Sequence, residues 1–173
     1  ESWGLDMASG DTLATFFPSD NEPPSSNYAT LDTRNLHPVL DFDGATDEEA
    51  VFTGLLPRNY ANGGLTVYCH VSFTSATSGS GRLQADIERM NASSLDIDAD
   101  SFTGTFQSTG VTAPSPSGQI VVGTITFTSG AQMDSLAAGE PFRLKIRRDA
   151  DGTSGTDDIT TDMELLVVEI KET

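Results

Sequence analysis

The sequence predicts an all-β protein, an antiparallel two-sheet β-sandwich with the jelly roll as the favoured topology. The first observation is the alternation of apolar and polar residues without a miss from Leu65 to Thr74, which indicates a half-buried strand. The second is the Ser/Gly-rich turn 75–81 and the alternating run 82–90 that follows it, which together indicate a hairpin. The third is the absence of the Cys…Trp…Cys spacing of antibody domains, since the one Trp is Trp3 and the one cysteine is Cys69.

Runs of the same kind recur from His37 onward, separated by clusters of Gly, Pro, Ser and Asp. The expected strands lie at 38–42, 49–55, 64–75, 81–91, 102–108, 119–128, 141–148 and 161–171. One short helix is expected at 131–137, where Met133 and Leu136 are spaced for one face of a turn. Eight strands with turn punctuation fit one sandwich domain, which we place at 36–173.

Residues 1–35 differ from the rest and predict an extended N-terminal arm. They hold Trp3, Phe16, Phe17 and Tyr28 among prolines and small polar residues, without a sustained period of 2 or 3.6. An arm with four aromatic residues is too apolar for a plain disordered linker, so it lies either on its own sandwich or on a neighbouring molecule.

The chain is strongly acidic, with 26 acidic and 9 basic side chains and a formal net charge of −17. Such a charge repels phosphate backbones and anionic membranes, so we expect neither nucleic acid nor a membrane as partner. Apolar runs fall short of the roughly 20 residues that span a bilayer, and the N-terminal residues do not resemble a signal peptide. The acidity favours solubility or docking onto a basic partner.

Four basic residues, Arg143, Lys145, Arg147 and Arg148, lie within six positions of one expected strand. This basic stripe has two interpretations. It forms ion pairs with carboxylates on neighbouring strands, or it contacts another molecule.

The residues do not assemble a catalytic signature, and we expect neither an enzyme nor a cofactor. His37 and His70 are isolated, and no G-x-S-x-G elbow, P-loop or CxxC pair is present. Cys69 fits a small buried hydrophobe. Paired carboxylates for glycoside hydrolysis are not excluded by counting, but the aromatic residues that line a sugar cleft are scarce. The phenylalanines at inward strand positions indicate core; these are Phe42, Phe52, Phe73, Phe127 and Phe142.

The metal candidate of the sequence is weak. Asp96, Asp98 and Asp100 match positions 1, 3 and 5 of a calcium loop, but Ser101 replaces the glycine and Gln107 the bidentate glutamate. A second acidic loop holds four carboxylates, at Asp149, Asp151, Asp157 and Asp158. We therefore assign no metal.

Several local sequences resemble a family of jelly-roll decoration, or cement, proteins of tailed-bacteriophage capsids. The matching segments are 38–43, 52–60, 63–65, 87–90, 96–102, 142–149 and 162–166. The resemblance implies a homotrimeric virion protein on the capsid surface that binds the major capsid protein, lies at threefold axes and bridges neighbouring capsomers.

Two functions follow as hypotheses. In the first, the chain is a non-enzymatic structural protein that stabilises a phage capsid, with Trp3, Phe16 and Phe17 as anchors and the stripe residues Arg143, Lys145 and Arg147 as subunit contacts. In the second, it is a glycan-binding module of a head fibre or tail, with calcium in an acidic loop. A jelly-roll hydrolase or lyase is the least favoured reading.

Overall fold

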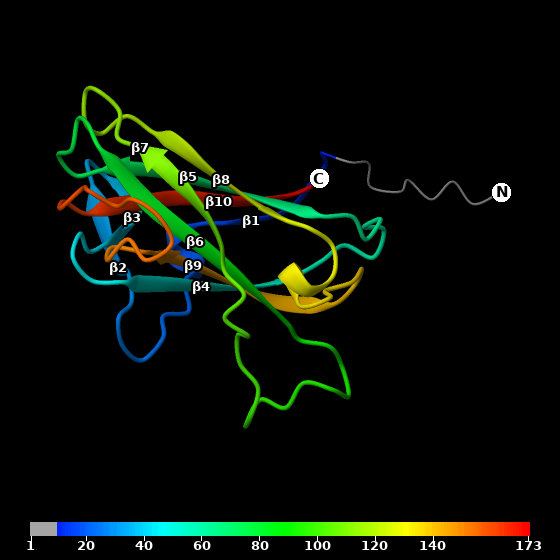
Figure 1. Cartoon of the computed structure of the whole chain (residues 1–173). Coiled ribbons are helices and arrows are strands. Elements are labelled where there is room, and N and C mark those ends of the chain that lie inside the picture. The colour runs from blue at the N-terminus through cyan, green and yellow to red at the C-terminus, as the bar shows by residue number, and fades with distance from the viewer. Residues whose placement is uncertain (1–9) are drawn as a thin grey trace.

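The computed structural model describes residues 10–173, and strands dominate it (Figure 1). The strands are β1 (Thr12–Phe16), β2 (Thr30–Arg34), β3 (His37–Phe42), β4 (Glu48–Leu55), β5 (Leu65–Phe73), β6 (Ser80–Arg89), β7 (Gln107–Thr112), β8 (Val121–Phe127), β9 (Pro141–Arg148) and β10 (Met163–Glu172). Two single-turn 3₁₀ helices, η1 (Pro18–Asp20) and η2 (Ala131–Met133), complete the elements of this part of the chain.

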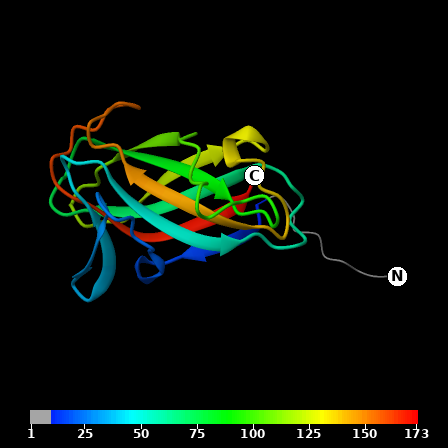
Figure 2. The same ribbon diagram turned by 90° about the horizontal axis from the view of Figure 1, so that it is seen from below.

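The strands form two antiparallel sheets, which confirms the predicted sandwich (Figures 1 and 2). The larger sheet has the order β2-β3-β10-β5-β8, with β1 also pairing β10, and the smaller sheet has the order β4-β9-β6-β7. Without β1 and β2, eight strands remain in two four-stranded sheets, and the chain changes sheet at every connection except the β6–β7 hairpin. This strand order is that of a jelly roll.

The core lies between the sheets, because apolar residues alternate inward along each central strand. The five phenylalanines predicted as core are at most 1% exposed, and Cys69 is a buried free thiol. Burial raises the pKa of Cys69 to about 12, so the thiol stays protonated and inert at neutral pH.

From Thr12 onward the expected arm lies on its own sandwich, the first of the two alternatives, and part of it belongs to the larger sheet. β1 pairs with β10, and β2 forms a hairpin with β3. Phe16 is buried and stacks on Phe52 with ring centroids 5.3 Å apart. It is therefore a core residue and not an anchor for another molecule. Phe17 is 52% exposed, and Trp3 lies outside the described residues.

The strand expected at 102–108 and the helix expected at 131–137 also differ from the structure. The strand begins only at Gln107, and the segment between β6 and β7 extends below the sandwich in Figure 1. The helix shrinks to η2, because Asp134 and Ser135 adopt the left-handed conformation that ends it. Within residues 10–173, no helix has the length and hydropathy to cross a membrane.

Candidate functional site

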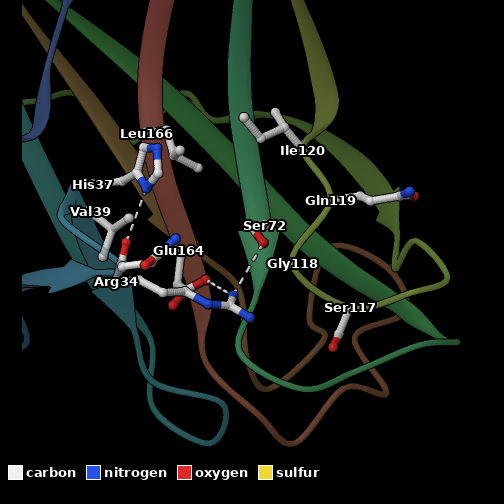
Figure 3. A pocket seen from close by; sticks show the side chains of 11 residues that line it. Arg34, His37, Val39, Ser72, Ser117, Gly118, Gln119, Ile120, Glu164 and Leu166 are labelled. Atoms are coloured by element: carbon white, nitrogen blue, oxygen red, sulfur yellow. Dashed lines mark hydrogen bonds and ion pairs between the residues drawn. The ribbon is translucent and has the colours of Figure 1, made fainter.

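A groove on the larger sheet is the candidate site (Figure 3). It has a volume of about 420 Å³, within the range of about 300–1,000 Å³ typical of small-molecule sites. Its lining comes from the β2–β3 hairpin, β5, β10 and the segment that precedes β8. The lining residues are Arg34, Asn35, His37, Val39, Ser72, Ser117, Gly118, Gln119, Ile120, Glu164 and Leu166.

The β2–β3 hairpin positions one wall of this groove. Asn35 and Leu36 connect the strands, and both have positive φ, 47° and 66°, as in a type I′ turn. This tight turn pairs Arg34 with His37, and the His37 Nδ1 atom lies 3.2 Å from the Arg34 carbonyl oxygen. The cation and the imidazole therefore enter the groove from the same end of one hairpin.

Arg34 crosses from the hairpin to the middle of the sheet (Figure 3). Its Nη1 donates to the Glu164 carboxylate and, over 3.0 Å, to the Phe73 carbonyl; its Nη2 donates to the Thr74 carbonyl over 3.2 Å. Gly118 closes over the guanidinium, because a Cβ atom there would lie 3.0 Å from Nη2. With its φ of +89°, this position favours glycine on both counts.

Acidic side chains surround this arginine. Glu164 is buried and stands opposite Asp41 in the β3–β10 register. Burial, followed by the charges of Glu164, Asp32 and Asp162, raises the pKa of Asp41 to about 6. One Asp41 carboxylate oxygen is buried and has no hydrogen-bond partner among the described residues. Arg34 and Glu164 thus balance each other in the groove lining, and the carboxylates around Glu164 place surplus negative charge beside the groove.

The rest of the lining is uncharged and mixed in polarity. Asn35, Ser117 and Gln119 offer both hydrogen-bond donors and acceptors, whereas Ile120 is an apolar side chain that is 56% exposed. Such a surface suits a ligand that has hydroxyl groups along its edges and C–H groups on its face.

The sequence-based metal candidate is an exposed turn. The Asp96 amide donates to the Asp100 carboxylate over 2.8 Å, and the Asp98 amide donates to Asp96 over 3.0 Å. In the described part of the chain, the carboxylates that converge are instead Asp47, Asp149 and Asp151, whose ligand atoms lie within 4.8 Å of one another. Calcium binding at 96–100 stays a prediction.

Asp149 of this convergent trio already has partners in the protein. Burial raises its pKa, but hydrogen bonds from Ser154 and Thr153 outweigh burial and lower the pKa to about 2. Only Asp149 and Asp151 come from the second acidic loop of the sequence, while Asp47 comes from the turn before β4. Sequence spacing gives no signal for that third carboxylate.

The basic stripe contacts its own chain. Arg143 pairs with Glu88 and Lys145 with Glu49, across neighbouring strands, so the predicted cross-strand ion pairs are confirmed. Arg147 donates to Gln84 over 2.7 Å.

Two aromatic rings cover the stripe. Phe102 lies 4.8 Å from the Arg143 guanidinium, and Phe106 lies 4.2 Å from that of Arg147. Arg148, adjacent to Arg147 in a strand, points to the opposite face and is fully buried, so it does not belong to the stripe. The intermolecular role of Arg143, Lys145 and Arg147 stays a prediction.

Sequence reasoning missed the groove, although His37 was singled out. Arg34, Ser72 and Glu164 are far apart in the chain and match no motif. The one available signal was the isolated arginine at the end of a short polar run before Asn35. His70 is partly buried in β5 and does not line the groove.

Neither the scan against protein-family models nor the search of curated proteins finds a match. Among solved structures, the chain is similar to the C-terminal carbohydrate-binding module, CBM6, of LamC, a marine laminarinase from Zobellia galactanivorans, at 14% identity and a TM-score of 0.47, covering 94% of this chain and all of that one. It is also similar to the CBM35 from Cellvibrio japonicus Abf62, at 11% identity and a TM-score of 0.45. This match covers 96% of this chain and 89% of that one. A third similar structure is the CBM22-2 xylan-binding domain from Paenibacillus barcinonensis Xyn10C, at 11% identity and a TM-score of 0.43. This match covers 93% of this chain and 99% of that one. Since these TM-scores are below 0.5, the jelly-roll assignment rests on strand order and register.

Proposed function

We propose that this chain is a non-catalytic glycan-binding module that holds its ligand in the groove of the larger sheet. The observation that carries the proposal is the groove itself, which combines a volume suited to a small ligand with a mixed lining. The groove favours the glycan-binding hypothesis over the capsid hypothesis, for which residues 10–173 offer no comparable site.

The lining matches the chemistry of a sugar. Sugar hydroxyls both donate and accept hydrogen bonds, as do the amides of Asn35 and Gln119 and the hydroxyl of Ser117. The C–H face of a pyranose ring is apolar, and Ile120 and Leu166 offer apolar contact to it. The groove uses aliphatic side chains for this contact where many sugar sites use aromatic rings.

Binding without hydrolysis follows from the carboxylates. Most glycosidases need two carboxylates on either side of the scissile bond, one of them free to transfer a proton. Among the described residues that line the groove, Glu164 is the single carboxylate, and Arg34 holds it in an ion pair.

The test is affinity electrophoresis of the full chain in gels that contain single polysaccharides, followed by calorimetry with those that retard it. Ile120→Ala removes the exposed apolar wall and should weaken binding by about tenfold or more, the equivalent of about 1.4 kcal/mol. Ile97→Ala is the matched control, because Ile97 is also an exposed isoleucine but lies in the segment between β6 and β7. Equal losses in both variants, or no retardation by any polysaccharide, would contradict the proposal.

We keep capsid decoration as a second candidate because Phe17 and Tyr28, in the N-terminal part of the chain, are 52% and 46% exposed. In this function the chain would assemble as a trimer and bind the major capsid protein on the virion surface. Co-sedimentation of the chain with undecorated capsids, together with its mass in solution, tests it. Binding that Phe17→Ala abolishes would support this candidate, and a monomer without affinity for shells would remove it.

A further inference from the structure

We infer that the groove selects neutral glycans and rejects uronic acids and sulfated sugars. This inference rests on the proposed function, since it specifies the ligand of the same groove. It concerns Arg34, which is the residue that would otherwise attract an anionic sugar.

The charge of Arg34 is already compensated inside the protein. Its guanidinium is paired with Glu164, whose side chain is only 5% exposed, and its Nη atoms also donate to the carbonyls of Phe73 and Thr74. The backbone of Gly118 lies against the same guanidinium. A ligand carboxylate that binds Arg34, whose side chain is 37% exposed, competes with Glu164 for the same cation, and leaving Glu164 buried and unpaired is costly.

The surroundings add repulsion. Asp41 and Asp32 lie on the two strands of the hairpin wall. Burial first, and then the charges of Glu164, Asp32 and Asp162, raise the pKa of Asp41. The whole chain carries a net charge of −17. An anion approaching the groove therefore meets a negative potential both locally and at long range.

The uncharged groups do not share this preference. Asn35, Ser117 and Gln119 line the groove without a formal charge and can bond hydroxyl groups of any neutral sugar. Neutral glycan binding should therefore depend little on salt, because no ion pair forms with the ligand.

The experiment compares the full chain on pairs of polysaccharides that share a backbone and differ in charge. Suitable pairs are methyl-esterified pectin with polygalacturonate, and unsubstituted with sulfated β-glucan. We expect the neutral member of any pair that binds to bind about tenfold or more tightly than the anionic one. Its affinity should change less than about twofold between about 20 and 300 mM NaCl. Tighter binding of an anionic member, falling with salt, would overturn the inference while leaving the proposed function intact. Retention by no polysaccharide, neutral or anionic, would instead overturn the proposed function.

Glu164→Gln provides the second arm, because it keeps the side-chain shape and removes the charge that compensates Arg34. This variant should gain about tenfold or more in affinity for the anionic member and acquire salt dependence. Glu169→Gln is the matched control, since Glu169 lies on the same strand but outside the groove. Circular dichroism confirms folding. A folded Glu164→Gln variant that still rejects the anionic member would overturn the inference, and if this variant does not fold, the comparison on the unmodified chain decides.

Discussion

Arg148 is a fully buried cation at the end of β9, held by one carboxylate and three backbone carbonyls. Its Nε and Nη2 each lie 2.9 Å from the Asp157 carboxylate, and its Nη1 donates to the Thr161 carbonyl over 2.7 Å. Arg148→Met would leave Asp157, whose side chain is 1% exposed, as a buried charge without a cation. We expect a loss of about 3–5 kcal/mol in the free energy of unfolding, measured by urea denaturation.

The control is Arg89→Met, since the Arg89–Glu140 pair is partly exposed on both sides. We expect this variant to lose about 1 kcal/mol or less. Similar losses in the two variants would contradict the assignment of Arg148 as a structural centre.

Asp41 gives the stability a dependence on pH. Its pKa in the folded chain is about 6, above the ordinary value of 3.8, so the folded chain binds the proton more tightly than the unfolded chain. Stability therefore falls as the pH rises from about 4 to about 6, and the full penalty is present above that range. Asp41→Asn should be more stable than the parent at pH 8, by about 1 kcal/mol once partial exposure is allowed for, and equal to it near pH 3.

Thermal denaturation at both pH values measures this difference. Asp98→Asn is the control, because Asp98 is exposed, and it should change stability equally little at pH 3 and pH 8. If Asp41→Asn were no more stable than the parent at pH 8, burial and the neighbouring carboxylates would not destabilise the charged form of Asp41.

At the scale of elements, the end of β1 contrasts two neighbouring phenylalanines, one buried and one exposed. Phe16 packs on Phe52 and Phe142 in the core, whereas Phe17 is half exposed. Phe16→Ala should cost about 3–5 kcal/mol of unfolding free energy, because it opens a cavity, and Phe17→Ala about 0.5 kcal/mol or less. Chemical denaturation of the pair tests this. Equal, small losses would mean that β1 does not hold the sandwich together.

The segment between β6 and β7 contacts β9 through cation–π interactions of its aromatic rings. Phe106 lies over the Arg147 guanidinium, with 4.2 Å from the ring centroid to Cζ. A double-mutant cycle with Phe106→Leu and Arg147→Gln should give a coupling energy of about 0.5–1 kcal/mol. The same cycle with Arg58→Gln, an exposed arginine in the β4–β5 loop, should give about 0.3 kcal/mol or less. A coupling to Arg147 as small as that to Arg58 would show that the ring does not bind the stripe.

The elements that sequence periodicity predicts are those with one buried face. β5 and β9 alternate strictly; β5 lies within two residues of its expected bounds, and β9 matches them. β1 and β2 were missed because they are short, and only their tertiary pairing with β10 and β3 makes them strands. The strand expected at 102–108 includes Phe102 and Phe106, but these rings contact cations on the outer face of the smaller sheet and not the core. The strand therefore begins only at Gln107.

At the scale of the whole molecule, the candidate site illustrates what a sequence does not contain. The groove joins residues near 35, 72, 118 and 165, which only the jelly-roll strand order brings together. Composition did indicate its electrostatic setting, because a chain with 26 acidic residues surrounds any pocket with negative charge. The compensation of Arg34 by Glu164 required the β2–β3 hairpin and the β10 register, neither of which has a motif.

The same charge imbalance predicts how salt affects the stability of the entire chain. Even if all nine basic residues were paired, 26 − 9 = 17 carboxylates would remain without a cation, so repulsion outweighs the ion pairs. Screening shortens the range of this repulsion to about 10 Å at 0.1 M salt. The melting temperature should therefore rise by about 2–5 °C between about 10 mM and 0.3 M NaCl at pH 8, the equivalent of about 1 kcal/mol. At pH 4 the effect should shrink, because many carboxylates are then protonated in both states. A melting temperature that falls with salt at pH 8 would mean that the buried and cross-strand ion pairs, and not the surplus carboxylates, dominate the electrostatic energy of the fold.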